Sequence, residues 1–468
     1  SLSHWLFPFL PWGARSKCAA AAMSQIQQKT YRAVALAIVL FSLPGCRPEA
    51  PPIKAESHGD GNSESISATP PEGPAQPLGL AEIPWPAKIK PEELRASVKS
   101  GIDYLVRSTN EQGKFAYIVN TDPDVPPTDE YNVVRHAGTM YGLGMYLERY
   151  QADNDVVRET LKKHGAFLRQ QIEPVEGEEE MLAIWSDPSV TGLEGPRRAE
   201  LGSAALGLIG LSCVEREAPG SVPPEELSGL ANFILFMQKD DGDFYARYVP
   251  EEGGKLYVPK LLFYPGESAL ALILLYEVDG NKRWLEAAAK SIAFMSQQRD
   301  EHNNPPLDHW MLLATSRIWP VYDKTSQPVS RQHLIRYSVD LCERLMVRSI
   351  RRLDDERLKG CITGNGFTCP TATRVEGLVA ALNYLPSDRM VFRTRVQRVS
   401  EDALVFLMNI HVSQGKYRVG IPYAMFRLPD DHPWQQNDYN KMQGEIRIDY
   451  VHHAISGMML YDDVVLRK

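Results

Sequence analysis

The sequence predicts an all-α fold, an (α/α)6 toroid of six helical hairpins, over residues 91–468. Three observations lead to this prediction. Twelve helical segments alternate strictly between two types, one type is amphipathic while the other is rich in Gly and Ala, and the alternation recurs six times. A ring of inner helices enclosed by outer ones needs these two types, because only the outer helices keep a face in water.

The outer segments carry apolar residues at three- and four-residue spacing and charged residues elsewhere, as burial of one face requires. They are residues 91–109, 154–172, 224–238, 281–298, 331–350 and 394–412.

The inner segments open with polar residues and continue as apolar stretches rich in small residues. Gly138, Gly142 and Gly144 lie in the first of them. An isolated Gly in a helix costs about 1 kcal/mol relative to Ala, so their number indicates a demand for close helix packing. The inner segments are residues 131–147, 199–212, 264–278, 308–319, 372–385 and 449–463.

Three outer segments end in a similar turn that is followed by an aromatic residue, in residues 110–119, 238–249 and 413–421. Each pattern predicts a turn into a short extended segment that leads back toward the next inner helix.

The residues before the ring predict export and a lipid anchor. Met23 is the first plausible start, so residues 1–22 are treated as an upstream extension. Residues 23–45 have the basic start and the apolar run of a signal peptide, and the run is too short to span a membrane. Cys46 ends a stretch that resembles a bacterial lipobox, so we expect it to carry lipid; the alternative is an ordinary signal peptide with an incidental Cys.

Residues 46–86 are rich in Pro, Gly, Ser and Glu, which predicts a disordered tether. The expected location is therefore the bacterial cell envelope, facing the periplasm or the exterior, with the membrane as a partner through Cys46. The net charge of −8 disfavours nucleic acid as a partner.

The six hairpins of residues 91–468 resemble the six-hairpin glycosidase superfamily and its relatives, the sugar 2-epimerases and glucuronyl epimerases. The resemblance is one of architecture and transfers no catalytic residues. The turn in residues 238–244, QKDDGDF, also resembles turns in terpenoid cyclase and prenyltransferase toroids.

The inner helices all run in the same direction, so their first turns gather on one rim of the ring. Ionisable and aromatic residues are dense there, which makes this rim the predicted site for a glycan or other small-molecule substrate. The predicted substrate-binding residues are Tyr131, Arg135, Glu200, Tyr264, His309, Trp310, Arg374, Glu376, Arg447 and His452.

Glu267 and Asp308 are the predicted acid/base pair. A partly buried carboxyl group at the start of an apolar helix has a raised pKa, which suits a general acid. His136 and Asp449 are further catalytic candidates. The plainer alternatives are that such carboxylates stabilise helix starts and that the histidines belong to the core.

No cofactor is predicted. A zinc site formed by Asp308 and His309 with His452, His453 or Cys361 is a competing hypothesis, although the usual zinc-ligand spacings are missing. A disulfide between Cys361 and Cys369 stays open.

These patterns favour a glycoside hydrolase or a sugar epimerase that uses the rim carboxylates as general acid and base. Two alternatives remain: a terpenoid- or lipid-handling toroid, and a non-catalytic glycan- or peptide-binding module.

Overall fold

The computed structural model describes residues 89–150, 154–192, 195–347, 358–363, 366–431 and 439–467, all within the unit Ile66–Lys468. The predicted signal peptide, Cys46 and the tether lie outside the described residues.

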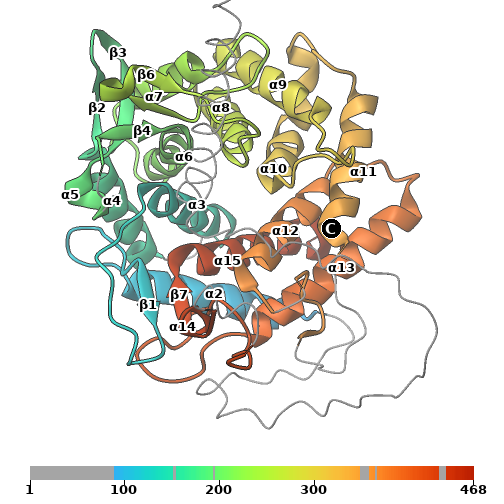
Figure 1. Ribbon diagram of the computed structural model, residues 1–468. Coiled ribbons are helices and arrows are strands. Elements are labelled where there is room, and N and C mark those ends of the chain that lie inside the picture. The colour runs from blue at the N-terminus through green and yellow to red at the C-terminus, as the bar shows by residue number, and fades with distance from the viewer. Residues whose placement is uncertain are drawn as a thin grey trace, which may run out of the picture. The chain divides into compact units, whose positions relative to one another are not determined.

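Two concentric sets of helices make up the fold (Figure 1). The outer helices are α2 (Pro91–Arg107), α4 (Asp155–Arg169), α7 (Pro224–Met237), α9 (Lys282–Gln297), α11 (Arg331–Met346) and α13 (Met390–Asn409). The inner helices are α3 (Val133–Tyr150), α6 (Leu201–Glu217), α8 (Tyr264–Asp279), α10 (His309–Ile318), α12 (Thr368–Ala381) and α15 (Ile448–Tyr461).

The inner helices form a closed ring, because each packs on the next and α15 packs back on α3. Each follows an outer helix in the chain, as the alternation predicted. The predicted (α/α)6 toroid is therefore confirmed. Boundaries differ by a few residues; α12, for example, begins at Thr368 rather than at residue 372.

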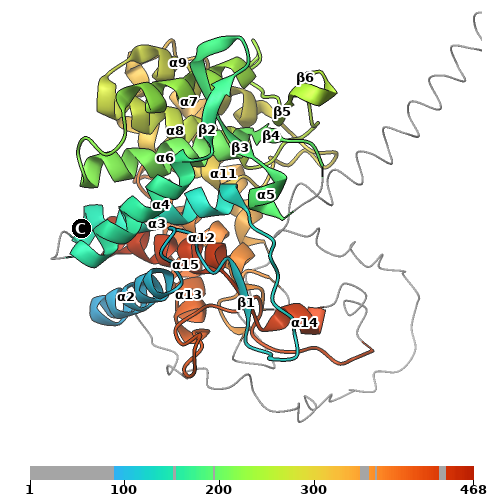
Figure 2. The ribbon, with the colours of Figure 1, turned by 90° about the vertical axis from the view of Figure 1, so that its left-hand side faces the viewer.

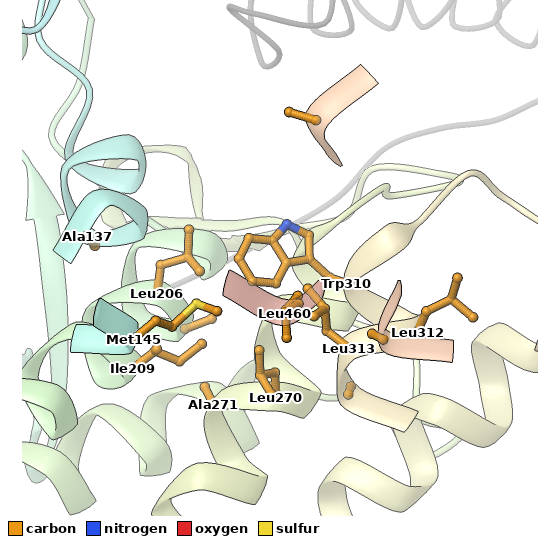
Figure 3. Packing of buried hydrophobic residues seen from close by; sticks show 14 of the residues in the cluster. Ala137, Met145, Leu206, Ile209, Leu270, Ala271, Trp310, Leu312, Leu313 and Leu460 are labelled. Atoms are coloured by element: carbon orange, nitrogen blue, oxygen red, sulfur yellow. The ribbon is translucent and has the colours of Figure 1, made fainter. Parts of the chain in front are cut away.

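The composition of the two sets follows from their burial. In α6 every residue from Leu201 to Val214 is buried, whereas α4 buries only one face. Figure 3 shows side chains from several inner helices, among them Leu206, Leu270 and Trp310, packed together. Full burial of a Leu contributes roughly 1.5–3 kcal/mol, so the ring derives much of its stability from such contacts.

The glycines of the inner helices allow close packing. A β-carbon on Gly377 of α12 would lie 3.0 Å from Cβ of His309 on α10. A β-carbon on Gly210 of α6 would lie 3.1 Å from Cβ of Met140 on α3. Such distances are tighter than ordinary van der Waals contact, so the predicted packing demand is confirmed at these positions.

Two antiparallel sheets add to the ring, and the sequence analysis did not anticipate the larger one. Its strands pair in the order β2 (Ile172–Val175), β3 (Glu178–Ser186), β4 (Arg198–Glu200), β5 (Arg247–Val249) and β6 (Gly254–Leu256). The smaller sheet pairs β1 (Ile118–Asn120) with β7 (Glu445–Arg447). The strands β4 and β7 lead directly into α6 and α15, so both sheets border the rim where the inner helices begin (Figure 2).

Two of the three predicted turns lead into a strand. Thr109 pairs with Phe115 and Gln238 with Phe244 in equivalent isolated bridges, followed by β1 and β5. Residues 413–421 also form a turn, but no strand directly follows it in the described part of the chain. The short elements are α5 (Pro188–Thr191), α14 (Tyr439–Gln443), the 3-10 helices η1 (Pro250–Glu252) and η2 (Trp319–Lys324), and the π-helix η5 (Asp462–Leu466).

None of the described helices is long and apolar enough to cross a membrane. Cys361 and Cys369 are free thiols, so the disulfide left open by the sequence does not form in the structure. The thiol of Cys361 lies 3.1 Å from the hydroxyl of Thr363, and that of Cys369 lies 3.9 Å from Asp449 Oδ2.

Candidate functional site

A buried cluster of two arginines and a carboxylate joins the starts of α3 and α15. Arg447 donates to both oxygens of Asp449, at 2.5 and 2.9 Å, and Arg135 Nε donates to Asp449 Oδ2 at 3.0 Å. Burial alone would raise the pKa of Asp449, but Arg447 and Arg135 hold it well below its usual range. Asp449 is therefore ionised, and Arg135 is held in place beside it with its Nη1 on the Tyr117 hydroxyl.

A second cluster brings together three neighbouring inner helices. His453 Nδ1 lies 2.7 Å from Glu376 Oε2, and His309 Nε2 lies 3.4 Å from the same oxygen. Burial opposes ionisation of Glu376, yet attraction to His453 and His309 and the hydrogen bond from His453 hold its pKa at about 2. Because Glu376 is ionised, His453 Nδ1 carries the hydrogen and donates it.

The surroundings of Glu267, unlike those of Glu376, disfavour ionisation of the carboxyl group. Its side chain is only 5% exposed, and Oε2 has no hydrogen-bond partner among the described residues. Burial, reinforced by the nearby Asp308, raises its pKa well above the usual range, while Arg135 opposes the shift. The surroundings therefore favour the protonated form of the carboxyl group, which has a hydrogen to donate.

Asp308 is the N-cap of α10. Its Oδ1 accepts a hydrogen bond from the Trp310 amide at 2.9 Å, and its side chain is fully buried. Burial raises its pKa to about 8, against the effect of surrounding backbone N–H groups. These are the contacts of a helix cap, and the acid/base role predicted for Asp308 remains a prediction.

The tautomer of His452 follows from its hydrogen bonds. Thr139 Oγ1 donates to the carbonyl oxygen of Arg135 at 2.9 Å and lies 3.2 Å from His452 Nδ1. Because the hydroxyl hydrogen is already used, Nδ1 must be the donor to Thr139, which leaves Nε2 as a bare acceptor. Burial and the adjacent His453 lower the pKa of His452 well below its usual range, so the ring is neutral.

His452 Nε2 has no hydrogen-bond partner among the described residues either. A β-carbon on Gly138 would lie 3.2 Å from His452 Cε1 and 3.3 Å from Cδ1 of Leu206. A β-carbon on Gly202 would lie 2.9 Å from Glu267 Oε2. Gly202 and Leu206 are four residues apart on the same face of α6, about 6 Å along its axis. His452 Nε2 and the carboxyl group of Glu267 therefore lie near the same stretch of α6.

The other predicted rim residues surround these groups. Glu200 accepts from Arg198 Nε at 2.9 Å and from the Tyr264 hydroxyl at 3.5 Å. The ring of Trp310 lies 5.2 Å from that of His309 and 6.0 Å from that of His453, measured between centroids. Arg374 Nη1 donates to the Ile362 carbonyl at 2.8 Å.

The structure places Tyr131 and His136 together. The Tyr131 hydroxyl lies 2.7 Å from His136 Nδ1, and His136 Nε2 lies 3.2 Å from the carbonyl oxygen of His164 on α4. The His136 ring packs against Phe115 and Phe167, and burial lowers its pKa to about 4. These contacts are typical of a core histidine between α3 and α4. The catalytic role predicted for His136 stays a prediction.

Sequence reasoning left out two residues of the site. His453 lay on the predicted rim but was not among the chosen site residues, and Thr139 was not considered. His309, Glu376 and His453 are buried, with potential ligand atoms within 4.8 Å of one another, and could hold a metal ion. The sequence hypothesis of a metal site had combined Asp308 and His309 with His452, His453 or Cys361, so it named His309 and His453 but not Glu376.

No protein-family model and no curated protein matches the chain. Solved structures are similar to it. A cellobiose 2-epimerase from Bacillus thermoamylovorans gives a TM-score of 0.57 at 10% identity, over 79% of this chain and 98% of that one. A D-mannose isomerase gives a TM-score of 0.54 at 10% identity, over 80% of this chain and 99% of that one. A glycoside hydrolase family 76 mannosidase from Bacteroides thetaiotaomicron gives a TM-score of 0.53 at 10% identity, over 81% of this chain and 98% of that one.

At such identities the likeness concerns the fold. The chain has the (α/α)6 toroid fold of the six-hairpin glycosidase-like proteins, which confirms the architectural resemblance inferred from the sequence.

Proposed function

We propose that this chain is a carbohydrate-active enzyme that epimerises or isomerises a sugar, with Glu267 as general acid and His452 as general base. One observation carries the proposal: Oε2 of Glu267 and Nε2 of His452, both buried and both without a hydrogen-bond partner among the described residues, lie near the same stretch of α6. The direction of the pKa shift of Glu267 suits an acid. Such a pair can give and take a proton at two adjacent atoms of one substrate.

The reaction that fits is proton transfer at the carbon beside a sugar carbonyl. His452 Nε2 takes the proton from that carbon, and Glu267 gives its proton to the carbonyl oxygen. The enediol formed in this way re-forms a carbonyl by one of two routes. If it turns over in the site, His452 returns the proton to the other face of the same carbon while Glu267 takes back the proton it gave, and the epimer forms. If His452 gives the proton to the former carbonyl carbon while Glu267 takes the proton of the neighbouring hydroxyl, the isomer forms. The similar structures include a cellobiose 2-epimerase and a D-mannose isomerase, which supports a sugar as substrate through a shared fold.

Hydrolysis of a glycoside is the less supported alternative. It needs an ionised carboxylate to attack the sugar or to activate water. Among the site carboxylates, Glu376 already pairs with His453, Asp449 with Arg447 and Arg135, and Glu200 with Arg198.

The test is turnover of reducing mono- and disaccharides by the full chain, followed by chromatographic separation of epimers and ketoses. Glu267→Gln and His452→Gln should each lower turnover by about 10²–10⁴-fold. Glu251→Gln and His302→Gln are the matched controls, since both residues are exposed, and they should match the parent. If Glu267→Gln and His452→Gln turn over a sugar at the parent's rate, the proposal is wrong.

A further inference from the structure

The cluster of His309, Glu376 and His453 shares no residue with the proposed acid and base, although the ring of His453 lies 4.0 Å from that of His452, measured between centroids. Its residues come from three consecutive inner helices, α10, α12 and α15. Their potential ligand atoms all lie within 4.8 Å of one another.

One atom of this cluster is left without a hydrogen bond. His309 is only 2% exposed, and its Nε2 has no hydrogen-bond partner among the described residues although it faces Glu376 Oε2 at 3.4 Å. A buried nitrogen without a partner costs free energy. The backbone of α12 packs closely against His309, since a β-carbon on Gly377 would lie 3.0 Å from its Cβ. The ring itself packs against Phe263, Trp310 and His453 at centroid distances of 5.3, 5.2 and 5.6 Å.

We propose that His309 Nε2, Glu376 and His453 Nδ1 bind one divalent transition-metal ion of the zinc type. Two imidazole nitrogens and one carboxylate are a ligand set of catalytic zinc sites, which leave a fourth position for water or substrate. Magnesium and calcium prefer sets of oxygen ligands and are not expected here.

The spacing is compatible with such an ion. Ligand atoms at 2.0–2.1 Å from a tetrahedral ion lie about 3.3 Å apart, close to the 3.4 Å between His309 Nε2 and Glu376 Oε2. The 2.7 Å hydrogen bond from His453 to Glu376 has to open by roughly 0.6 Å, and the hydrogen has to leave Nδ1, so that the ring binds the ion as the tautomer with its hydrogen on Nε2. The side chain of His453 is 11% exposed, against 3% for His309 and 2% for Glu376, so it is the most accessible of the three.

The experiment uses the full chain stripped with EDTA, dialysed, and titrated with ZnCl2 or MgCl2. Bound metal is measured by elemental analysis, and the unfolding temperature is recorded with and without zinc. We expect one zinc per chain, no magnesium, and a higher unfolding temperature with zinc. His309→Gln and Glu376→Gln should weaken zinc binding by at least about 100-fold, the upper end for residues that only support a ligand.

His302→Gln is the matched control, because His302 is an exposed histidine outside the cluster, and it should bind zinc like the parent. Unfolding temperatures in EDTA show whether a variant has lost zinc or its fold; if His309→Gln does not fold, Glu376→Gln decides. Absence of zinc from the parent, or equal affinity in the parent and the folded cluster variant, would overturn the inference. It is read out without substrate, so its outcome is independent of the proposed function.

Discussion

Thr139 on α3 holds His452 on α15 in one tautomer. The hydroxyl donates to the Arg135 carbonyl and accepts from His452 Nδ1 at 3.2 Å, which leaves His452 Nε2 free to accept a proton. The proposed base therefore depends on a residue that does not touch the substrate.

Removing that hydroxyl should impair turnover without unfolding the ring. Thr139→Val keeps the shape of the side chain but loses the hydrogen bond, so we expect kcat to fall about tenfold, the equivalent of about 1.4 kcal/mol, with KM nearly unchanged. Thr139→Ser restores the hydroxyl and should recover most of kcat. Steady-state kinetics of the three proteins decide the matter, and a valine variant with the parent's kcat would show that the tautomer is unimportant.

Asp308 should affect the free energy of unfolding and the way in which this free energy depends on pH. Its folded pKa of about 8 lies above the ordinary value of 3.8, so the folded chain binds more protons than the unfolded chain between these values. The free energy of unfolding should therefore decrease as the pH rises from about 4 to 8, by at most about 1.4 kcal/mol per unit from this group.

Asp308→Asn keeps a good N-cap and cannot ionise, so it should lose less stability over this range and keep its turnover. Asp308→Ala removes the cap and should cost about 1 kcal/mol. Urea unfolding at pH 5 and pH 8 measures both effects. A large loss of turnover in a stable Asp308→Asn protein would instead support the acid/base role predicted from the sequence.

Gly138 should be needed for the position of His452. A methyl group there would lie 3.2 Å from His452 Cε1, so Gly138→Ala should displace the imidazole and lower kcat about tenfold. The helix propensity gained from Ala, about 1 kcal/mol, should largely offset the crowding in stability. Gly210→Ala is the control, because its methyl group meets Met140 at a similar 3.1 Å away from the histidines. Equal kcat values for both variants would count against this role.

Lipid on Cys46 can be tested separately from catalysis. When the full precursor is expressed in bacteria with a labelled fatty acid, the label should appear on the protein. The Cys46→Ser variant should be unlabelled and should move to the soluble fraction. Label on the serine variant would disprove the prediction for this residue.

The ring could be predicted from the sequence because helices that are buried on all sides need apolar and small residues, and the inner helices are rich in both. The larger sheet could not, since three of its strands have only three residues and β3 runs from exposed to buried without alternating. The sequence could place the side chains around Glu376 on one rim of the ring, but it could not show which of them pair with one another. His453 lies 77 residues from Glu376, and the bond between Thr139 and His452 spans 313 residues.

The most direct test of the account is transfer of solvent hydrogen to the sugar. The full chain is incubated with reducing sugars in D2O, and the products are analysed by NMR and mass spectrometry. The account predicts a carbon-bound deuterium beside the carbonyl in the epimer or ketose formed, and a loss of about 10²–10⁴-fold in its rate of appearance in His452→Gln. New reducing ends without carbon-bound deuterium would contradict the account and indicate a hydrolase.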